Sequence, residues 1–204
     1  MSSLSLLVPC YNASAYIEKL AAVVAETSVF LREVLLVDDC STDDSFQRAL
    51  ALGLPVVQTP YNMGPGGARN FGVEFLCGEW VHFLDADDVL SVETLYNSLR
   101  YLNETVDVLL VGARWVHEIT GEVLKEWAIH PQDVALNPLL YSLSSPIPTH
   151  CSILRIEQFR TIGGFDPQLR CWEDGDLHVR LAAHGSRFSV MDGILTTSIR
   201  HDRG

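Results

Sequence analysis

Short apolar runs alternate with amphipathic helical patterns through the first hundred residues. The runs at 4–8, 34–37, 56–58 and 81–84 have the length and composition of strands. The periodic segments between and after them predict helices at 15–29, 44–52, 67–76 and 91–102. Strands that alternate with helices form βαβ units, so the predicted fold class is α/β with a mostly parallel sheet.

The pattern changes after another apolar run at 106–111. Residues 114–119 and 122–127 flank Thr120-Gly121 like the strands of a hairpin. The prolines between Asn137 and Pro148 predict a long loop with a helical turn at 139–143. Two further helices and two closing strands are then expected, at 156–162, 175–183, 187–190 and 195–199. No linker composition interrupts the chain, so we expect one domain over residues 1–204.

Composition limits the partners and the compartment. The net charge is -12 and the lysines are only Lys19 and Lys125, which disfavours binding to nucleic acid or to an anionic membrane. No apolar run approaches the length of a membrane span, although peripheral membrane association stays open. The five cysteines are odd in number and lack metal-ligand spacing, which favours reduced thiols and a cytoplasmic protein.

An apolar run at 80–84 leads directly into three acids, Asp85, Asp87 and Asp88. Acids just past the carboxyl end of a parallel strand lie where α/β proteins bind ligands. Such close like charges repel, and a divalent ion that bridges to phosphate oxygens is the usual solution. The alternative is a capped loop, because Ser91 begins an amphipathic helical pattern.

Two other predicted strands also end in polar residues. Pro9-Cys10-Tyr11-Asn12 follows the first strand and offers an aromatic face and an amide. Asp38-Asp39 ends the second strand, where an acid accepts hydrogen bonds from a ribose or a base edge. Helix capping is the alternative at both places, but Ser41 or Thr42 suffices for it and leaves Asp38-Asp39 unexplained.

A glycine-rich loop, residues 62–70, joins the third strand to its helix. Its glycines allow close backbone approach, the helix N-terminus favours anions, and Arg69 adds a bidentate donor for phosphate. The loop lacks the lysine of a Walker motif. A flexible turn with a surface arginine is the alternative.

A third acidic cluster, Trp172-Glu173-Asp174-Gly175-Asp176, opens a helix. Acids at a helix N-terminus are stabilised by the helix dipole, so capping is the simple interpretation. A carboxylate beside an aromatic ring also suits a general base next to a docked sugar. Near the chain end, His201 is either a metal ligand or an incidental residue of a solvated tail.

Read in order, these motifs resemble family 2 glycosyltransferases, whose GT-A fold is a three-layer α/β/α sandwich. The resemblance spans nearly the whole chain and rests on Val8–Asn12, Val37–Asp43, Asn62–Gly64 with Ala68–Asn70, Phe83–Asp88, Gly163–Asp166 and Glu173-Asp174. One departure is Cys40, where the family usually has a glycine. The resemblance implies inverting transfer of a sugar from a nucleotide-diphosphate donor, with uridine as the favoured base, to an acceptor hydroxyl.

The resemblance also implies roles on the donor side, in a nucleotide-sugar-binding half at residues 1–112. Pro9, Tyr11 and Asp39 would frame the base and ribose, with Asn12 nearby. Arg69 would lie near the diphosphate. Asp85 would face the ribose or the donor sugar.

Asp87 would hold Mn²⁺ or Mg²⁺ against both phosphates, with His201 as a further ligand. The second half, residues 113–204, would face the acceptor, a carbohydrate or glycolipid in polysaccharide or glycoconjugate synthesis. Asp174 would deprotonate the acceptor hydroxyl. The residues implied on the acceptor and sugar side are Gly164, Trp172 and Glu173.

Three other functions stay open on the sequence. A phosphatase would use Asp85 as nucleophile. That class carries its acids on the first strand and has a later lysine, whereas here the acids follow the fourth predicted strand and only Lys125 lies beyond them. A nucleotidyltransferase would have a glycine-rich loop with a basic residue after the first strand, where this sequence has Asn12 and Ala13. A nucleotide-sugar-binding module without turnover is the third, and the intact acidic clusters argue against it.

Overall fold

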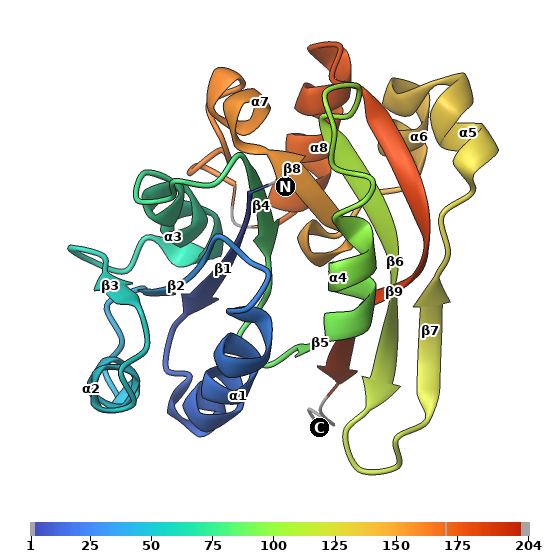
Figure 1. Ribbon diagram of the computed structural model, residues 1–204. Helices are drawn as coiled ribbons and strands as arrows, with labels where there is room; N and C mark the ends of the chain where they lie inside the picture. The colour runs from blue at the N-terminus through green and yellow to red at the C-terminus, as the bar shows by residue number, and fades with distance from the viewer. Residues whose placement is uncertain (1–2, 170, 201–204) are drawn as a thin grey trace.

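A mixed sheet runs through the computed structural model, which describes residues 3–169 and 171–200. Its strands are β1 (Leu4–Cys10), β2 (Glu33–Asp38), β3 (Val56–Gln58), β4 (Trp80–Phe83), β5 (Val89–Leu90), β6 (Val108–His117), β7 (Val123–Trp127), β8 (Ser152–Arg155) and β9 (Phe188–Arg200). Among the described residues the strand order is β3-β2-β1-β4-β8-β6-β9-β5, with β7 paired to β6 (Figure 1).

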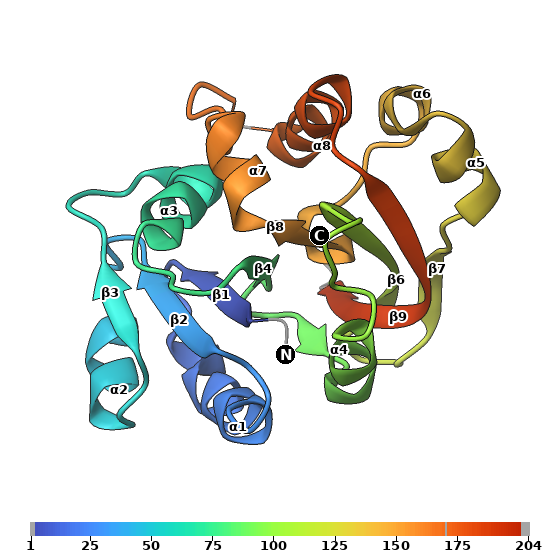
Figure 2. The same cartoon turned by 45° about the horizontal axis from the view of Figure 1, so that its top comes forward.

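Helices cover both faces of this sheet. They are η1 (Ser14–Tyr16), α1 (Ile17–Thr27), α2 (Ser45–Ala51), α3 (Gly64–Val73), α4 (Val92–Ser98), α5 (Pro131–Leu136), α6 (Pro138–Ser144), η2 (Thr149–Cys151), α7 (Ile156–Thr161) and α8 (Glu173–Ala183). Figure 2 shows α1, α2 and α4 along one face and α3, α7 and α8 along the other. The predicted three-layer α/β/α sandwich is confirmed.

Alternate residues of β1 enter two separate cores. Leu6 is fully buried in a cluster that includes Leu20 of α1 and Leu95 of α4. Leu7 is fully buried in the other cluster, with Ala68 of α3. Side chains alternate between the faces of a strand, so a strand that is covered on both faces is apolar almost throughout. This explains why β1 is apolar at every position except Ser5.

The parallel part of the sheet is the part that the sequence predicts best. β1 is parallel to both β2 and β4, and β2 is parallel to β3. β8 then runs antiparallel to both β4 and β6, and the long strands β6 and β9 are again parallel. An antiparallel strand therefore joins two parallel regions of one sheet.

The second half differs from the prediction in its strands. The segments 106–111 and 114–119 fall largely within one strand, β6, and 187–190 and 195–199 fall largely within β9. The register between them shifts on either side of Gly112, where a Cβ would lie 2.7 Å from the carbonyl oxygen of Gly193. Both strands therefore continue through an irregularity of the bulge type. β6 also crosses the expected boundary at 112/113, and the division into two functional halves stays a prediction.

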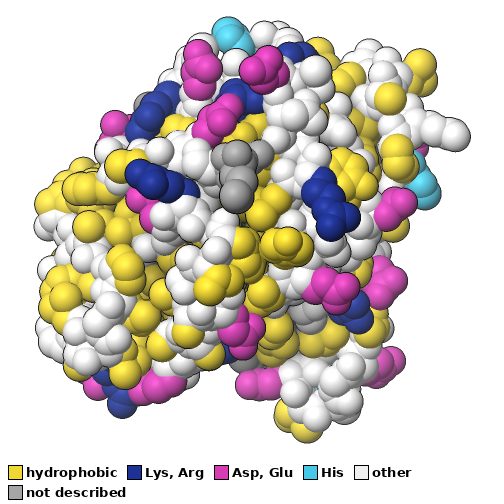
Figure 3. Space-filling view, viewed as in Figure 1, with side chains coloured by type: hydrophobic (Ala, Val, Ile, Leu, Met, Phe, Trp, Pro, Cys, Tyr) yellow, Lys and Arg dark blue, Asp and Glu magenta, His cyan; other side chains and the backbone are white. Residues whose placement is uncertain are grey.

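Positive charge is dispersed over the face of the molecule that Figure 3 shows. On the face in Figure 3, lysine and arginine side chains lie among acidic ones and do not gather into a patch. Several described arginines pair with acids of the chain itself: Arg48, Arg69, Arg155, Arg160, Arg180 and Arg187. Much of the positive charge is therefore used within the fold.

Candidate active site

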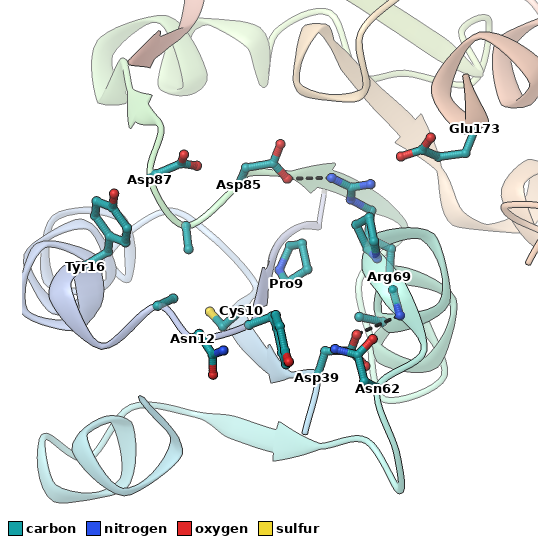
Figure 4. Close-up of a pocket in the computed structure, with 16 residues that line it drawn as sticks. Pro9, Cys10, Asn12, Tyr16, Asp39, Asn62, Arg69, Asp85, Asp87 and Glu173 are labelled. Carbon is teal, nitrogen blue, oxygen red and sulfur yellow. Dashed lines mark hydrogen bonds and ion pairs between the residues drawn. The ribbon is translucent and has the colours of Figure 1, made fainter. Parts of the chain in front are cut away.

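The carboxyl ends of β1, β2 and β4 border a cavity of about 510 Å³. β1 has β2 on one side and β4 on the other, and open α/β sheets bind ligands where the strand order changes direction in this way. Predicted site residues around this cavity are Pro9, Tyr11, Asn12, Asp39, Arg69, Asp85, Asp87 and Glu173 (Figure 4). The structure thus brings them to one space, and their individual roles stay predictions.

Asp39 anchors the glycine loop. Its Oδ1 accepts hydrogen bonds from Thr59 Oγ1 at 2.9 Å and from Met63 N at 2.8 Å, and its Oδ2 accepts one from Gly64 N at 2.8 Å. A carboxylate oxygen has two lone pairs, so Oδ2 retains capacity for a ligand in the cavity. Asp39 therefore fixes the loop and can also accept a hydrogen bond from a bound molecule.

Asn12 ties the end of β1 to the loop after β2. Its Oδ1 accepts hydrogen bonds from Thr42 N at 2.8 Å and from Asp43 N at 3.3 Å. In the same loop Cys40 has a φ of +57°, a left-handed conformation that glycine adopts most readily. The backbone of this loop therefore explains why glycine is usual at that position.

Arg69 is held from two sides at the cavity wall. It is 4% exposed, forms an ion pair with Asp85, and its Cζ lies 5.3 Å from the ring centroid of Phe165. Burial acts to raise the pKa of Asp85, but the charge and hydrogen bond of Arg69 together with the nearby His150 and His82 outweigh burial and hold that pKa below its usual value. Arg69 Nε has no hydrogen-bond partner among the described residues. A buried guanidinium with a spare N–H suits an anionic ligand.

Two motifs that are distant in sequence interlock beside Arg69. Asn70 Nδ2 donates to the carbonyl oxygen of Phe165 at 2.8 Å, and Phe165 N donates to Asn70 Oδ1 at 2.8 Å. Gly164 has a φ of +68°, and a Cβ there would overlap Asn70 Oδ1. Gly164, which the resemblance assigns to the acceptor side, therefore packs against the helix that carries Arg69.

We expect Gly164→Ala to lower the melting temperature more than Gly163→Ala. Both glycines have positive φ, +68° and +83°, so each alanine costs about 1–2 kcal/mol of backbone strain. Only a Cβ at Gly164 meets neighbouring atoms, and overpacking costs a further ~1–3 kcal/mol. Thermal unfolding followed by circular dichroism measures the difference. Equal losses would show that the contact between Asn70 and Phe165 shifts to make room.

The loop after β4, residues 85–88, presents Asp87 to the cavity and buries Asp88. Burial and the nearby charge of Asp85 raise the pKa of Asp88 to about 7. Asp85, Asp88 and His150 each place a ligand atom within 4.8 Å of the others. Among the described residues, Asp88 Oδ2 and His150 Nε2 have no hydrogen-bond partner. Carboxylates are donors for Mn²⁺ and Mg²⁺, so the acids of this loop fit a divalent ion, whereas His201 lies outside the described residues.

Glu173 and Asp174 open α8 at another wall of the cavity. Glu173 lines it and also lines an adjacent cavity of about 390 Å³. Asp174 is half-buried, its Oδ1 accepts a hydrogen bond from Gly175 N at 2.8 Å, and it is not among the described residues that line either cavity. Trp172 precedes them with its side chain mostly exposed. The wall that the two cavities share therefore carries the Glu173 carboxylate, which follows the exposed Trp172 in sequence.

The cavity has further lining residues that the sequence interpretation did not assign to a role. Asn62 stands in the glycine loop, where its position is a signal, whereas no sequence pattern marks Tyr16 of η1 (Figure 4). Cys10 also lines the cavity, and burial together with the charges of Asp38 and Asp85 raises the pKa of its thiol to about 12. The Cys10 thiol therefore stays protonated and does not act as a thiolate nucleophile.

α8 also buries His178, whose Nδ1 lies 2.7 Å from the carbonyl oxygen of Asp174. Burial lowers the pKa of His178 to about 4, against about 6.5 in an unfolded chain. Between these values the unfolded state binds more protons, so this contribution to stability is present above pH 6.5 and is lost as the pH falls through 4.

We therefore expect the free energy of unfolding to fall more steeply between pH 6.5 and 4 in the wild type than in His178→Asn. The difference approaches about 1.4 kcal/mol per pH unit. Urea unfolding at a series of pH values measures it, with the exposed His184→Asn as control. Parallel curves for the wild type and His178→Asn would mean that the folded protein accepts this proton.

These features define a class of protein: a three-layer α/β domain that can take an anionic ligand at the carboxyl ends of its parallel strands. The sequence profile of Glycosyl transferase family 2 matches residues 5–163, which is most of the chain. This chain belongs to that family. Its membership confirms the resemblance, identifies a transferase and removes the phosphatase and nucleotidyltransferase alternatives.

Two relatives share about 30% of their aligned residues with this chain. It is 31% identical over 202 residues to the poly(ribitol-phosphate) beta-N-acetylglucosaminyltransferase TarS of Staphylococcus aureus, an alignment that covers 94% of this chain and 34% of that protein. It is 30% identical over 193 residues to the pre-mycofactocin glycosyltransferase of Mycobacterium tuberculosis, covering 90% of this chain and 40% of that protein. The chain thus spans well under half the length of either relative.

Solved structures confirm the GT-A fold. The crystal structure of TarS 1–349 in complex with UDP-GlcNAc matches with a TM-score of 0.78 and 27% identity, over 99% of this chain and 60% of that one. The mannosyltransferase PcManGT of Pyrobaculum calidifontis matches with a TM-score of 0.73 and 20% identity, over 98% of this chain and 58% of that one. Within the described ranges, none of the helices has the length and apolar character needed to cross a membrane.

Proposed function

We propose that the chain transfers a sugar from a uridine diphosphate donor to an acceptor hydroxyl, with inversion at the sugar carbon. The observation that supports this most directly is one cavity with Arg69, Asp85 and Asp87 on its walls and Glu173 facing them. Family membership supports the reaction type. TarS, which has the same fold at 27% identity, binds UDP-GlcNAc, and this supports a uridine nucleotide as the donor.

The donor nucleotide would lie over the ends of β1 and β2. Tyr11 is 51% exposed and offers its ring to the base, while Pro9 and Asn12 line the same end of the cavity. The free lone pair of Asp39 would accept a hydrogen bond from the base or the ribose. Arg69 would donate to the diphosphate, and Asp85, which orients Arg69, would also meet the ribose or the sugar.

The acid loop and His201 would hold Mn²⁺ or Mg²⁺. Asp87 is the carboxylate of this loop that lines the cavity without a described ion pair to an arginine, so it would be the ligand that meets the phosphates. When bound, the ion supplies positive charge to the departing diphosphate. The chain supplies little of its own there, because its net charge is -12 and Arg69 is already paired with Asp85. We therefore expect activity to require a divalent cation.

The acceptor would approach from the wall that carries Glu173, at the start of α8. Asp174 would take the proton of the acceptor hydroxyl, and the exposed ring of Trp172 would dock an acceptor sugar. A base on the side away from the leaving diphosphate gives direct displacement, so the product has the inverted configuration without a covalent intermediate. The acceptor would be a carbohydrate or glycolipid in polysaccharide or glycoconjugate synthesis. The free thiol state of all five cysteines supports a cytoplasmic reaction.

A thermal-shift screen tests the donor class. The melting temperature is measured with UDP-GlcNAc, UDP-glucose, GDP-mannose and dTDP-glucose, each with Mn²⁺ and with a chelator. A ligand at a hundred times its Kd stabilises the folded state by about 2.7 kcal/mol, roughly 5–10 °C for a domain of this size. We expect a UDP-sugar to give this shift only with Mn²⁺. No shift with any UDP-sugar would contradict the proposed donor.

Turnover is then measured as release of UDP from the donor that binds. Slow release without an acceptor, accelerated by a carbohydrate acceptor, is the expected result. Mn²⁺-dependent binding with no release and no transfer would instead favour a binding module that lacks turnover.

A further inference from the structure

The acid loop at residues 85–88 is contacted from two directions by side chains that have no role in the mechanism above. On one side, Lys19 Nζ of α1 donates to the carbonyl oxygen of Asp87 at 3.0 Å. On the other, His150 Nδ1 of η2 lies 3.5 Å from Asp88 Oδ2. The loop that presents Asp87 is therefore held between α1 and the segment that leads into β8.

His150 is itself firmly fixed. Its side chain is almost fully buried, and its ring packs edge-on against Trp115 of β6 with 5.7 Å between the centroids. Its carbonyl oxygen accepts a hydrogen bond from Thr196 Oγ1 of β9 at 3.2 Å. A residue whose ring packs on one long strand and whose backbone is bonded to another is a rigid support, unlike a side chain on a free loop.

The position of His150 relative to the acids is the decisive observation. Ligand atoms of Asp85, Asp88 and His150 lie within 4.8 Å of one another, so the imidazole is within reach of acids on both sides of Asp87 in sequence. Asp85 and Asp87 line the donor cavity, whereas Asp88 and His150 are buried and are not among its described lining residues. His150 thus lies behind the acids and not at the surface that a donor would touch.

We propose that His150 is a positioning residue for Asp87, which it aims at the ion and diphosphate by holding Asp88 and Asp85 against the sheet. Three carboxylates within four positions repel one another, and without a rigid contact the loop would relax away from the geometry that binds an ion. Supporting contacts of this kind typically change metal affinity by 10–100-fold. The inference rests on the proposed function, because it assumes a divalent ion bound with the donor.

The test compares UDP binding with and without metal. Calorimetric titration gives the Kd of UDP in Mn²⁺ and in chelator for the wild type, His150→Leu, His150→Asn and the control His184→Leu, which replaces an exposed histidine of the same chain. We expect the gain in affinity from Mn²⁺ to fall about tenfold in His150→Leu. It should partly recover in His150→Asn, whose amide can donate to Asp88, and stay at the wild-type value in His184→Leu.

The outcomes separate this inference from the proposed function. A wild-type protein with no gain from Mn²⁺ would overturn the proposed metal and the inference with it. A normal gain in the wild type that neither His150 variant reduces would overturn the inference alone, as would equal losses of UDP affinity in Mn²⁺ and in chelator, which indicate general distortion. Nitrogen modulation in the pulsed EPR signal of bound Mn²⁺ should be the same in wild type and His150→Asn. Its loss in the variant would make His150 a ligand and overturn the positioning role.

Discussion

Asp174→Asn is expected to remove nearly all sugar transfer while donor binding stays close to the wild-type value. A positioned general base contributes typically 10²–10⁴-fold to the rate, and an amide cannot accept the proton of the acceptor hydroxyl. The amide has the size of the carboxylate, and its oxygen can still accept the hydrogen bond from Gly175 N that measures 2.8 Å. Transfer assays give kcat, and calorimetric titration with UDP and Mn²⁺ gives the Kd of the nucleotide.

Glu173→Gln is the matched control for this prediction, because Glu173 is the neighbouring acid and the one that lines the cavity. We expect its kcat to fall by about tenfold or less, since a side chain that only contacts substrate contributes less than the base. A larger fall in kcat for Glu173→Gln than for Asp174→Asn would assign the base to Glu173. A large loss of nucleotide affinity in Asp174→Asn would contradict a role confined to the acceptor.

Most of the fold could be predicted because the strands of its parallel region are more deeply buried than the helices that connect them. β1, β2 and β4 are covered on both faces, so their sequences are apolar runs that stand out from the helices between them. β5 has two residues and α5 has six, too few for a periodic signal. β8 carries Arg155, whose burial depends on its pairing with Asp107 and on the nearby Trp80 ring. Such pairing is a tertiary property that local sequence does not report.

The candidate site also has features that the sequence could predict and features that it could not. The residues around the cavity could be predicted because they follow strands that share one edge of the sheet, and the chain order fixes that edge. Contacts between side chains that are distant in sequence could not be predicted. The interlocking of Asn70 with Phe165 and the contact of His150 with Asp88 join segments with no sequence relation. Gly164 illustrates the difference, because its motif was visible but its partner, Asn70, was not.

Asp87→Ala is expected to abolish metal-dependent donor binding and to lower transfer on the order of a thousandfold, since a bound ion supplies several kcal/mol of charge stabilisation. Asp192→Ala is the control, because it removes the same charge from an exposed position outside the donor cavity. The two variants should have similar Kd values for UDP in chelator and different values in Mn²⁺. Asp85 and Asp88 keep their ligand atoms near one another in this variant, so the test asks whether Asp87 is required in addition to them. Full activity in chelator, or Mn²⁺-dependent UDP binding that survives in Asp87→Ala, would show that the ion is not held by this carboxylate.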